Sequence, residues 1–482
     1  MTILPLSPAD RASPAALRAF LAECREAAVR SGQAKLVSIS LAVDALDPLA
    51  VLESIFEPGE PHFYAERPTL ETAISGAEVA REFEARGPER FAQVQRFIDE
   101  TLAHTIAVGD VESPFGGPHF FCAFGFAPEA EPGDPFPAAR VLVPRWQVAR
   151  AGATTTAVAN LPVDAGSDLD ALAERVWRAH RKFTRFEYGA GPAGGATERR
   201  AAPTGLTPVP GTAAPAATDY RTAVARALQH IAAGDFEKIV LARALDYTAP
   251  APLHPLRLLN GLRQRFPECY AFSLANGRGQ SFIGASPERL VRVSKGVLET
   301  EALAGSMPRG AGASDDAALG AALLHSEKDR REQRLVLENI TGRLAQLGLT
   351  AEHPAEPTLR RLANVQHLHT PVRAVLGGEV RLLTALAGLH PTPAVGGTPV
   401  TAALARIRPL EGFSRGLYGG ALGWVNARGG GEFFVGIRSA LVDGATARVY
   451  AGAGIVAGSS PEKEFAETEL KFRAMLDALH AP

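Results

Sequence analysis

The stretch YAGAGIVAGSSPEKEFAETELKF, residues 450–472, joins a glycine-rich apolar run to a charged segment with helical spacing. Steps of three and four residues put Glu464, Glu467 and Lys471 on one face of the predicted helix. Glu467 followed by Lys471 is also the favourable order for a solvated ion pair, so that simpler interpretation stays open. The glycines lack the GxGxxG spacing of a dinucleotide site, but they can present backbone N–H groups to a carboxylate.

A second predicted helix, residues 326–347, carries a carboxylate toward the core. Glu332 begins its inward stripe, which continues through Val336, Ile340, Leu344 and Leu347. A buried carboxylate is costly unless it is paired or bound to a cation, and a helix salt bridge from Lys328 to Glu332 is an equal alternative. Carboxylates from two helices, with no Cys or His beside them, suit magnesium, with water and an anionic substrate completing the shell.

Two further segments place a charged residue among apolar ones. In KIVLARAL, residues 238–245, strand alternation puts Lys238 on the same face as Val240 and Ala242. Lys238 is either a strand-end lysine in water or a desolvated lysine that can act as a base. Glu288 in FIGASPERL, residues 282–290, follows Ser-Pro between apolar runs that resemble paired strands, and a surface turn is its simpler interpretation.

The pair His367 and His369 imitates a metal site. Alternation along the predicted strand puts both rings on one face, but the sequence offers no third ligand. Hydrogen-bonded histidines are therefore favoured over zinc.

The composition is that of a globular protein with a small ligand. Hydrophobic residues make up 46% of the 482 residues, charged residues 21%, and the net charge is −2. No Lys/Arg block is present to attract nucleic acid or an anionic membrane. The three cysteines, Cys24, Cys122 and Cys269, support neither a disulfide framework nor a zinc site. Without a secretion signal or an apolar run of about 18 residues, we expect a cytoplasmic protein with no membrane association.

The N-terminal half reads as mixed helix and strand without recognisable chemistry. Predicted helices cover 14–31, 88–104 and 167–186, and predicted strands cover 36–43, 62–66, 141–146 and 154–159. Residues 189–218 are dominated by Gly, Ala, Pro and Thr, which predicts a flexible surface segment. A helix over 220–233 and the strand at Lys238 open a second half, residues 219–482.

Together these segments resemble the chorismate-utilising enzymes, a family that includes anthranilate, aminodeoxychorismate, isochorismate and salicylate synthases. The resemblance spans roughly residues 219–480 and rests on ten ordered motifs: KIVLAR, FIGASPERL, TEALAGSMPRG, SEKDRREQRLV, NVQHLHTPV, LHPTPAVGGTP, SRGLYGGALGW, FFVGIRSALV, YAGAGIVAGSSPEKEF and ETELK. It implies an α/β (α+β) fold in one large chorismate-binding domain, with two antiparallel β-sheets packed as a sandwich and surrounded by helices. Residues 1–188 would then be a variable N-terminal part of the same sandwich.

The resemblance also implies a site. Glu332 and Glu467 would hold a magnesium ion, which in turn grips the ring carboxylate of chorismate. Lys238 matches the family's base and Glu288 its acid. The substrate contacts implied by the resemblance are Gly305, His367, Ala394, Tyr418, Arg438, Gly452, Gly454 and Lys471.

The nucleophile distinguishes the members of this family. Lys238 stands where anthranilate synthases generally carry a glutamine, because their nucleophile is ammonia. Ala304 stands where aminodeoxychorismate synthases commonly carry the lysine of a PIKGT motif. The segment that contains Ala394 is similar to that of isochorismate synthases, whereas salicylate synthases tend to have threonine there. We therefore expect an isochorismate synthase, which adds water at C2 of chorismate while the C4 hydroxyl leaves. A salicylate synthase is the alternative.

The remaining expectations concern partners and pathway. None of the cysteines sits in a Gly-flanked nucleophile elbow, so we expect no glutaminase. We also expect a monomer, and the resemblance implies chorismate and isochorismate as its ligands. Gln333 replaces a histidine found after the metal glutamate in many relatives, which predicts tuned metal binding. The long N-terminal half resembles menaquinone-pathway relatives, and siderophore biosynthesis is the alternative destination.

Overall fold

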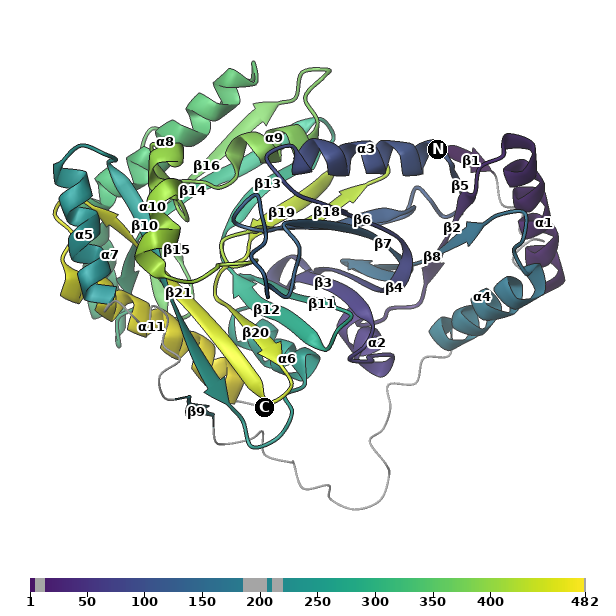
Figure 1. The fold of residues 1–482 in the computed structure, drawn as a ribbon, viewed down its shortest axis with the longest axis horizontal. Coiled ribbons are helices and arrows are strands. Elements are labelled where there is room, and N and C mark those ends of the chain that lie inside the picture. The colour runs from purple at the N-terminus through teal and green to yellow at the C-terminus, as the bar shows by residue number, and fades with distance from the viewer. Residues whose placement is uncertain (5–13, 185–205, 210–219, 481–482) are drawn as a thin grey trace.

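The computed structural model describes residues 1–4, 14–184, 206–209 and 220–480 (Figure 1). The helices in these ranges are α1 (Pro14–Ser31), α2 (Pro48–Ser54), α3 (Arg90–Ala103), α4 (Leu169–Thr184), α5 (Tyr220–Ala232), α6 (Pro255–Arg265), α7 (Ala313–His325), α8 (Glu327–Gln346), α9 (Leu382–Leu389), α10 (Val400–Glu411) and α11 (Pro461–His480). The strands of the first half are β1 (Thr2–Leu4), β2 (Lys35–Val43), β3 (Pro61–Arg67), β4 (Thr72–Ala85), β5 (Thr105–Gly109), β6 (His119–Phe124), β7 (Ala139–Ala151), β8 (Thr154–Val163) and β9 (Thr207–Pro208). Those of the second half are β10 (Lys238–Thr248), β11 (Tyr270–Asn276), β12 (Gln280–Ser286), β13 (Arg289–Ser294), β14 (Val297–Pro308), β15 (Thr358–Arg361), β16 (Val365–Val375), β17 (Gly397–Thr398), β18 (Ala421–Asn426), β19 (Gly431–Val435), β20 (Ser439–Asp443) and β21 (Thr446–Val456).

The strands form one continuous hydrogen-bonded network that branches at β7. One end of β7 pairs with β6, the other end pairs with β8, and its opposite edge pairs with β4. The β10 arm runs through β4, β3, β11, β12, β20, β21 and β10. The β16 arm runs through β6, β18, β19, β13, β14 and β16. Every pairing within these arms is antiparallel.

Aromatic side chains from both arms meet in a core between them. Tyr270 stacks on Phe434 with ring centroids 4.9 Å apart, and Phe63 stacks on Phe121 at 4.4 Å. Such pairs add to the burial of apolar area that holds two layers together. The expected α/β sandwich is confirmed, with the correction that its two sheets are continuous through β4 and β7.

Helices cover the outer faces of both arms. Leu262 of α6 and Phe472 of α11 are fully buried in one cluster with strands of the β10 arm, while α8 and α9 pack on the β16 arm through Val336 and Leu386. Figure 1 shows α1 and α4 together at one end of the molecule, beside β2 and β8. No helix in the described ranges is long and apolar enough to cross a membrane.

The predicted elements of the N-terminal half are present, with ends that differ by a few residues. The helix over 14–31 has the predicted bounds, whereas the predicted strand over 141–146 is the middle of the longer β7. Strands from this half enter both arms, because β3 pairs with β11 and β6 pairs with β18. The predicted flexible segment 189–218 lies mostly outside the described residues. Its described part is not unstructured, since β9 pairs with the end of β10.

Two short links carry the chain from one arm to the other. Pro287 and Glu288 separate β12, which pairs with β20, from β13, which pairs with β19. Residues 436–438 separate β19 from β20 in the same way. These neighbouring links form the crossing corner, and they carry two of the predicted site residues, Glu288 and Arg438.

Candidate active site

Lys238 is fully buried at the first position of β10. Its side chain is 0% exposed, and its Nζ donates a hydrogen bond of 2.8 Å to Oε1 of Glu332 on α8. An ammonium group without water needs an opposite charge close by, which Glu332 supplies. The interpretation of Lys238 as a strand-end lysine in water is therefore wrong, and the sequence did not reveal Glu332 as its partner.

Ser326 and Gly454 fix where the Glu332 carboxylate lies. The Ser326 side chain caps α8 by accepting a hydrogen bond from the N–H of Asp329, which sets the start of the helix. Gly454 of β21 lies opposite Val240 of β10, and a Cβ atom on Gly454 would lie 2.4 Å from Oε1 of Glu332. The Lys238–Glu332 pair therefore requires the absence of a side chain at Gly454.

The charged face of α11 points into the same region. Oε1 of Glu467 lies 2.8 Å from Nζ of Lys471, which also donates a 2.7 Å hydrogen bond to the carbonyl of Gly452. Burial tends to raise the pKa of Glu467, but Lys471, Lys328 and Arg438 hold that pKa below its ordinary value. The Glu467–Lys471 ion pair is present as predicted, but it is half-buried rather than solvated.

The alternative salt bridge from Lys328 to Glu332 is wrong. Nζ of Lys328 instead bonds Oε1 of Glu464 on α11 at 2.8 Å. Burial raises the pKa of the Glu464 carboxyl. Spacing along one helix could not reveal this pair, because it joins two helices that meet only in the folded chain.

Glu288 lies in the crossing corner and is only 5% exposed. Burial, followed by the nearby charge of Glu301, raises its pKa to about 8, although Lys238, Arg360 and Lys471 act in the opposite direction. The carboxyl therefore keeps its proton near neutral pH. The interpretation of Glu288 as an exposed turn residue is wrong.

Arg438, on the second link of the corner, has a free guanidinium. No hydrogen bond or ion pair joins that guanidinium to another residue of the described ranges, and burial lowers its pKa. Its backbone is in the left-handed region, with φ of 50°. An unpaired, partly desolvated Arg fork is suited to a carboxylate, to which it can donate two parallel hydrogen bonds.

Tyr418 lies close to the same region. It is 6% exposed, stacks on Tyr450 at 5.1 Å, and its Oη would lie 3.0 Å from a Cβ atom placed on Gly452. Burial raises the pKa of Tyr418 to about 12, so the phenol is a neutral hydrogen-bond donor.

His367 presents an unsatisfied nitrogen. Its Nδ1 donates to the carbonyl of Gly305 at 3.1 Å, while its buried Nε2 has no partner in the described residues. Burial lowers the pKa of His367 to about 3, so the ring is neutral and Nε2 is an acceptor. His369 lies 3.1 Å from Glu301, and the expectation of hydrogen-bonded histidines is confirmed.

Gly305 is required by its backbone. It lies in β14 where the register against β16 shifts between Ala304 and Ser306, and its φ is 72°. A Cβ atom there would lie 3.0 Å from the Cβ of Asp329 on α8. Only glycine combines this backbone with so close an approach.

The loop that carries Ala394 runs beside β10. The N–H of Val240 donates to the carbonyl of Gly396 at 2.8 Å, and Arg415 donates to the carbonyl of Val395 at 2.7 Å. Ala394 itself is half-buried and packs on the apolar cluster formed with α9 and α10. The structure brings this loop to the Lys238 strand, where β17 pairs with Lys238 and Ile239.

The carboxylates that face one another on α8 and α11 provide only oxygen ligands. Burial raises the pKa of Asp329, and the negative charges of Glu332 and Glu467 add to the rise. No group of three or more His, Cys, Asp or Glu residues in the described ranges is arranged to hold a metal ion. Two glutamates with oxygen ligands from water and substrate nevertheless match the chemistry of a hard divalent cation.

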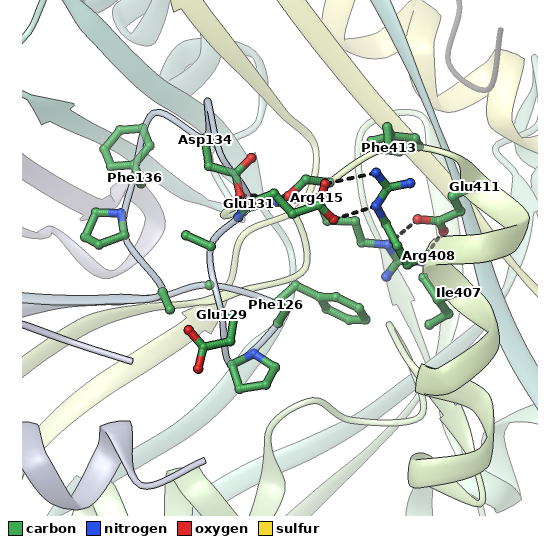
Figure 2. A pocket seen from close by; sticks show the side chains of 18 of the residues that line it. Phe126, Glu129, Glu131, Asp134, Phe136, Ile407, Arg408, Glu411, Phe413 and Arg415 are labelled. Atoms are coloured by element: carbon green, nitrogen blue, oxygen red, sulfur yellow. Dashed lines mark hydrogen bonds and ion pairs between the residues drawn. The ribbon is translucent and has the colours of Figure 1, made fainter. Parts of the chain in front are cut away.

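A cavity of about 180 Å³ lies between the 125–138 segment and residues 404–416, which include the end of α10 (Figure 2). Arg415 points at Glu411 there, and this buried pair supports β10 through the N–H of Ala242 and the carbonyl of Val240. Phe126 lies under the Arg415 guanidinium at 4.2 Å. Arg415 and Glu411 are therefore engaged with each other and with the strand of Lys238, rather than free to bind a ligand.

Sequence reasoning missed the charged residues behind Glu288. Glu301 is buried in β14 and accepts two hydrogen bonds from Arg360 of β15. A signal was present, because TEALAG puts an acidic residue inside an apolar strand. Its partner could not be identified without the pairing of β14 and β15 with β16.

The comparisons with known proteins agree with this geometry. The family described as "Chorismate binding enzyme" matches residues 20–480. The salicylate biosynthesis isochorismate synthase of Pseudomonas aeruginosa is 36% identical over 457 residues, which cover 92% of this chain and 90% of that protein. The isochorismate synthase MenF of Bacillus subtilis is 31% identical, with 92% and 94% covered.

Solved structures show the same fold. MenF, the menaquinone-specific isochorismate synthase from Escherichia coli, superposes with a TM-score of 0.75 at 28% identity, covering 95% of this chain and 99% of that one. Anthranilate synthase component I from Streptococcus pneumoniae shares the fold with a TM-score of 0.63 at 20% identity, covering 84% and 92%. The expected family is confirmed: the chain belongs to the chorismate-binding enzymes.

Proposed function

We propose that this enzyme is an isochorismate synthase, which converts chorismate to isochorismate by adding water at C2 while the C4 hydroxyl leaves. The observation that carries the proposal is the pair of Lys238 and Glu288, one a buried amine and the other a carboxyl with a pKa of about 8. A reaction that takes a proton from water and gives one to a departing hydroxyl needs a base and an acid in different environments.

In this proposal Lys238 takes the proton from the attacking water and Glu288 donates its proton to the departing hydroxyl. Lys238 is enclosed, and its Nζ lies 2.8 Å from Oε1 of Glu332. Glu288 already holds its proton at neutral pH, because its pKa is raised to about 8. The acid is therefore ready before the substrate binds.

The substrate carboxylates have candidate partners around this pair. Arg438 offers an unpaired guanidinium, and Lys471 offers an ammonium held between Glu467 and the carbonyl of Gly452. The unpartnered Nε2 of His367 is an acceptor for a substrate hydroxyl. Fixing a rigid ring at several points supplies the orientation that the addition of water needs.

We also propose that Glu332 and Glu467 hold a magnesium ion. Their oxygen chemistry and their approach from two helices support the proposal, as does the cluster of negative charge that they form with Glu464 and Asp329. When bound, the ion would supply positive charge against the substrate ring carboxylate and would draw the Glu332 charge away from Lys238.

The substitution pattern supports water as the nucleophile. Lys238 stands where anthranilate synthases generally carry a glutamine, and Ala304 stands where aminodeoxychorismate synthases commonly carry a lysine. The residues that distinguish these amine-forming relatives are therefore absent.

The pathway that uses the product is a separate question. Relatives named for menaquinone and for salicylate biosynthesis are both matched over nearly their whole length, so the long N-terminal half does not favour either one.

Purified protein and chorismate test the proposal. Chromatography should show isochorismate without salicylate or pyruvate, and EDTA should abolish turnover until magnesium is restored. Lys238→Ala and Glu288→Gln should each lose about 100-fold or more in kcat while retaining the wild-type circular dichroism. The matched controls Lys463→Ala and Glu60→Gln, both at exposed positions, should behave as wild type. Normal turnover by both site variants would refute the assignment, and salicylate with pyruvate would identify the alternative enzyme.

A further inference from the structure

Two hydrogen bonds hold the backbone on either side of Glu288. Arg360 donates to the carbonyl of Pro287 at 3.2 Å, and the N–H of Arg289 donates to Oε1 of Glu301 at 3.0 Å. Arg360 and Glu301 are themselves joined by two hydrogen bonds of 2.7 and 2.9 Å. Glu301 and Arg360, joined to each other and to the backbone on both sides, therefore enclose Glu288, and this pair is called the bracket.

We propose that Glu301 and Arg360 are positioning residues for Glu288, fixing its backbone from both sides and acting on its carboxyl with opposite charges. This inference rests on the proposed function, in which Glu288 is the acid. Neither residue needs to touch the substrate, since each acts through the corner.

The surroundings of the bracket keep Glu301 ionised. Its side chain is 4% exposed, and burial alone would raise its pKa, but His369, Arg360 and Arg289 hold that pKa at about 2. Nε2 of His369 lies 3.1 Å from Oε2 of Glu301. A negative charge therefore lies behind the acid at neutral pH.

The charges that face Glu288 come from four elements. Glu301 of β14 favours the protonated carboxyl, whereas Lys238 of β10, Arg360 of β15 and Lys471 of α11 favour the ionised form. Tyr418 also lies within reach of the Glu288 charge, and its phenol is neutral below about pH 12. The two members of the bracket thus act on the acid with opposite sign, although each contributes one of the two backbone bonds.

This opposition gives a test that a merely structural role would fail. The alkaline limb of kcat/KM reports loss of the proton from the free enzyme's acid. Glu301→Gln removes the negative charge, so the limb should move down by about one pH unit, and Arg360→Gln should move it up by a similar amount. Both variants should also lose at least about tenfold in kcat. The control Asp47→Asn, which removes a carboxylate paired with Arg263 between α2 and α6, should leave the limb in place.

Shifts of the same sign in both bracket variants, or no shift in either, would overturn the inference. If Glu301→Gln does not fold, Glu301→Asp keeps the charge but is too short to hold both partners. It should lower kcat without moving the limb, and unchanged kcat would also overturn the inference.

A second measurement separates this inference from the proposed function. The pH at which Glu288 loses its proton can be read from unfolding curves, by comparing each bracket variant with the same variant carrying Glu288→Gln. If the two bracket variants shift the pH of Glu288 proton loss in opposite directions while the wild type converts no chorismate, the positioning role holds and the isochorismate synthase proposal fails. If the wild type converts chorismate but neither bracket variant shifts that pH, the proposed function holds and the positioning role fails.

Discussion

Replacing Glu288 by glutamine should stabilise the folded protein at neutral and alkaline pH while it removes the proposed acid. In the folded chain, burial raises the pKa of this carboxyl from 4.5 to about 8. In the unfolded chain the carboxyl ionises at its ordinary pKa. Between these two values the unfolded state loses a proton that the folded state keeps, so the wild type loses stability as the pH rises.

The size of the effect follows from the difference in pKa. Each pKa unit corresponds to about 1.4 kcal/mol, so the free energy of unfolding should fall by about 3 kcal/mol at pH 7 and about 5 kcal/mol above pH 8. Below pH 4.5 both states are protonated and nothing is lost. A glutamine, which does not titrate, avoids this loss altogether.

Denaturation by urea at about pH 5, 7 and 9 would measure the difference between wild type and Glu288→Gln. The variant should gain on the wild type steadily across this range and should be the more stable protein at the highest pH. Glu60→Gln at an exposed position is the control and should run parallel to the wild type. A constant difference between wild type and Glu288→Gln would show that the carboxyl titrates normally, and the reasoning about its buried acid would be wrong.

Three further changes test other parts of the site. Gly454→Ala puts a Cβ atom 2.4 Å from the nearest carboxylate oxygen and should lower kcat about 100-fold in the chorismate assay, whereas Gly342→Ala, in open space on α8, should not. Arg438→Lys replaces a fork by a point charge and should raise KM for chorismate about tenfold with a smaller effect on kcat, and an unchanged KM would remove Arg438 from the substrate site. Lys328→Met leaves the Glu464 carboxylate buried without its partner and should cost about 2 kcal/mol in urea denaturation, and adding Glu464→Gln should recover part of it.

Much of the fold and site was predictable because it depends on local patterns. The helix over 14–31 and the strand from Lys238 follow from periodicity and alternation, and both are present. Pairing across the chain was not predictable in the same way. Lys328 has an acid four residues away, yet its ammonium bonds Glu464, because the approach of α8 to α11 depends on packing rather than on spacing.

Burial was equally beyond the sequence. Lys238 and Glu288 each had a reasonable interpretation as an exposed residue, and only the tertiary structure shows both to be enclosed. The continuous sheet was missed because β7 changes partners along its length, and no residue type marks that change.

The crossing corner limits how this enzyme can vary. Its links are two and three residues long, and each continues at both ends into strands whose side chains alternate between faces. Inserting one residue in either link would shift the register of the strand that follows, unless a bulge absorbed it, and would turn that strand's side chains to the opposite faces of the sheet. Sites built on loops can change through insertions and deletions, but the two links of this corner must keep their lengths. New chemistry at the corner would have to come from exchanging side chains at fixed positions.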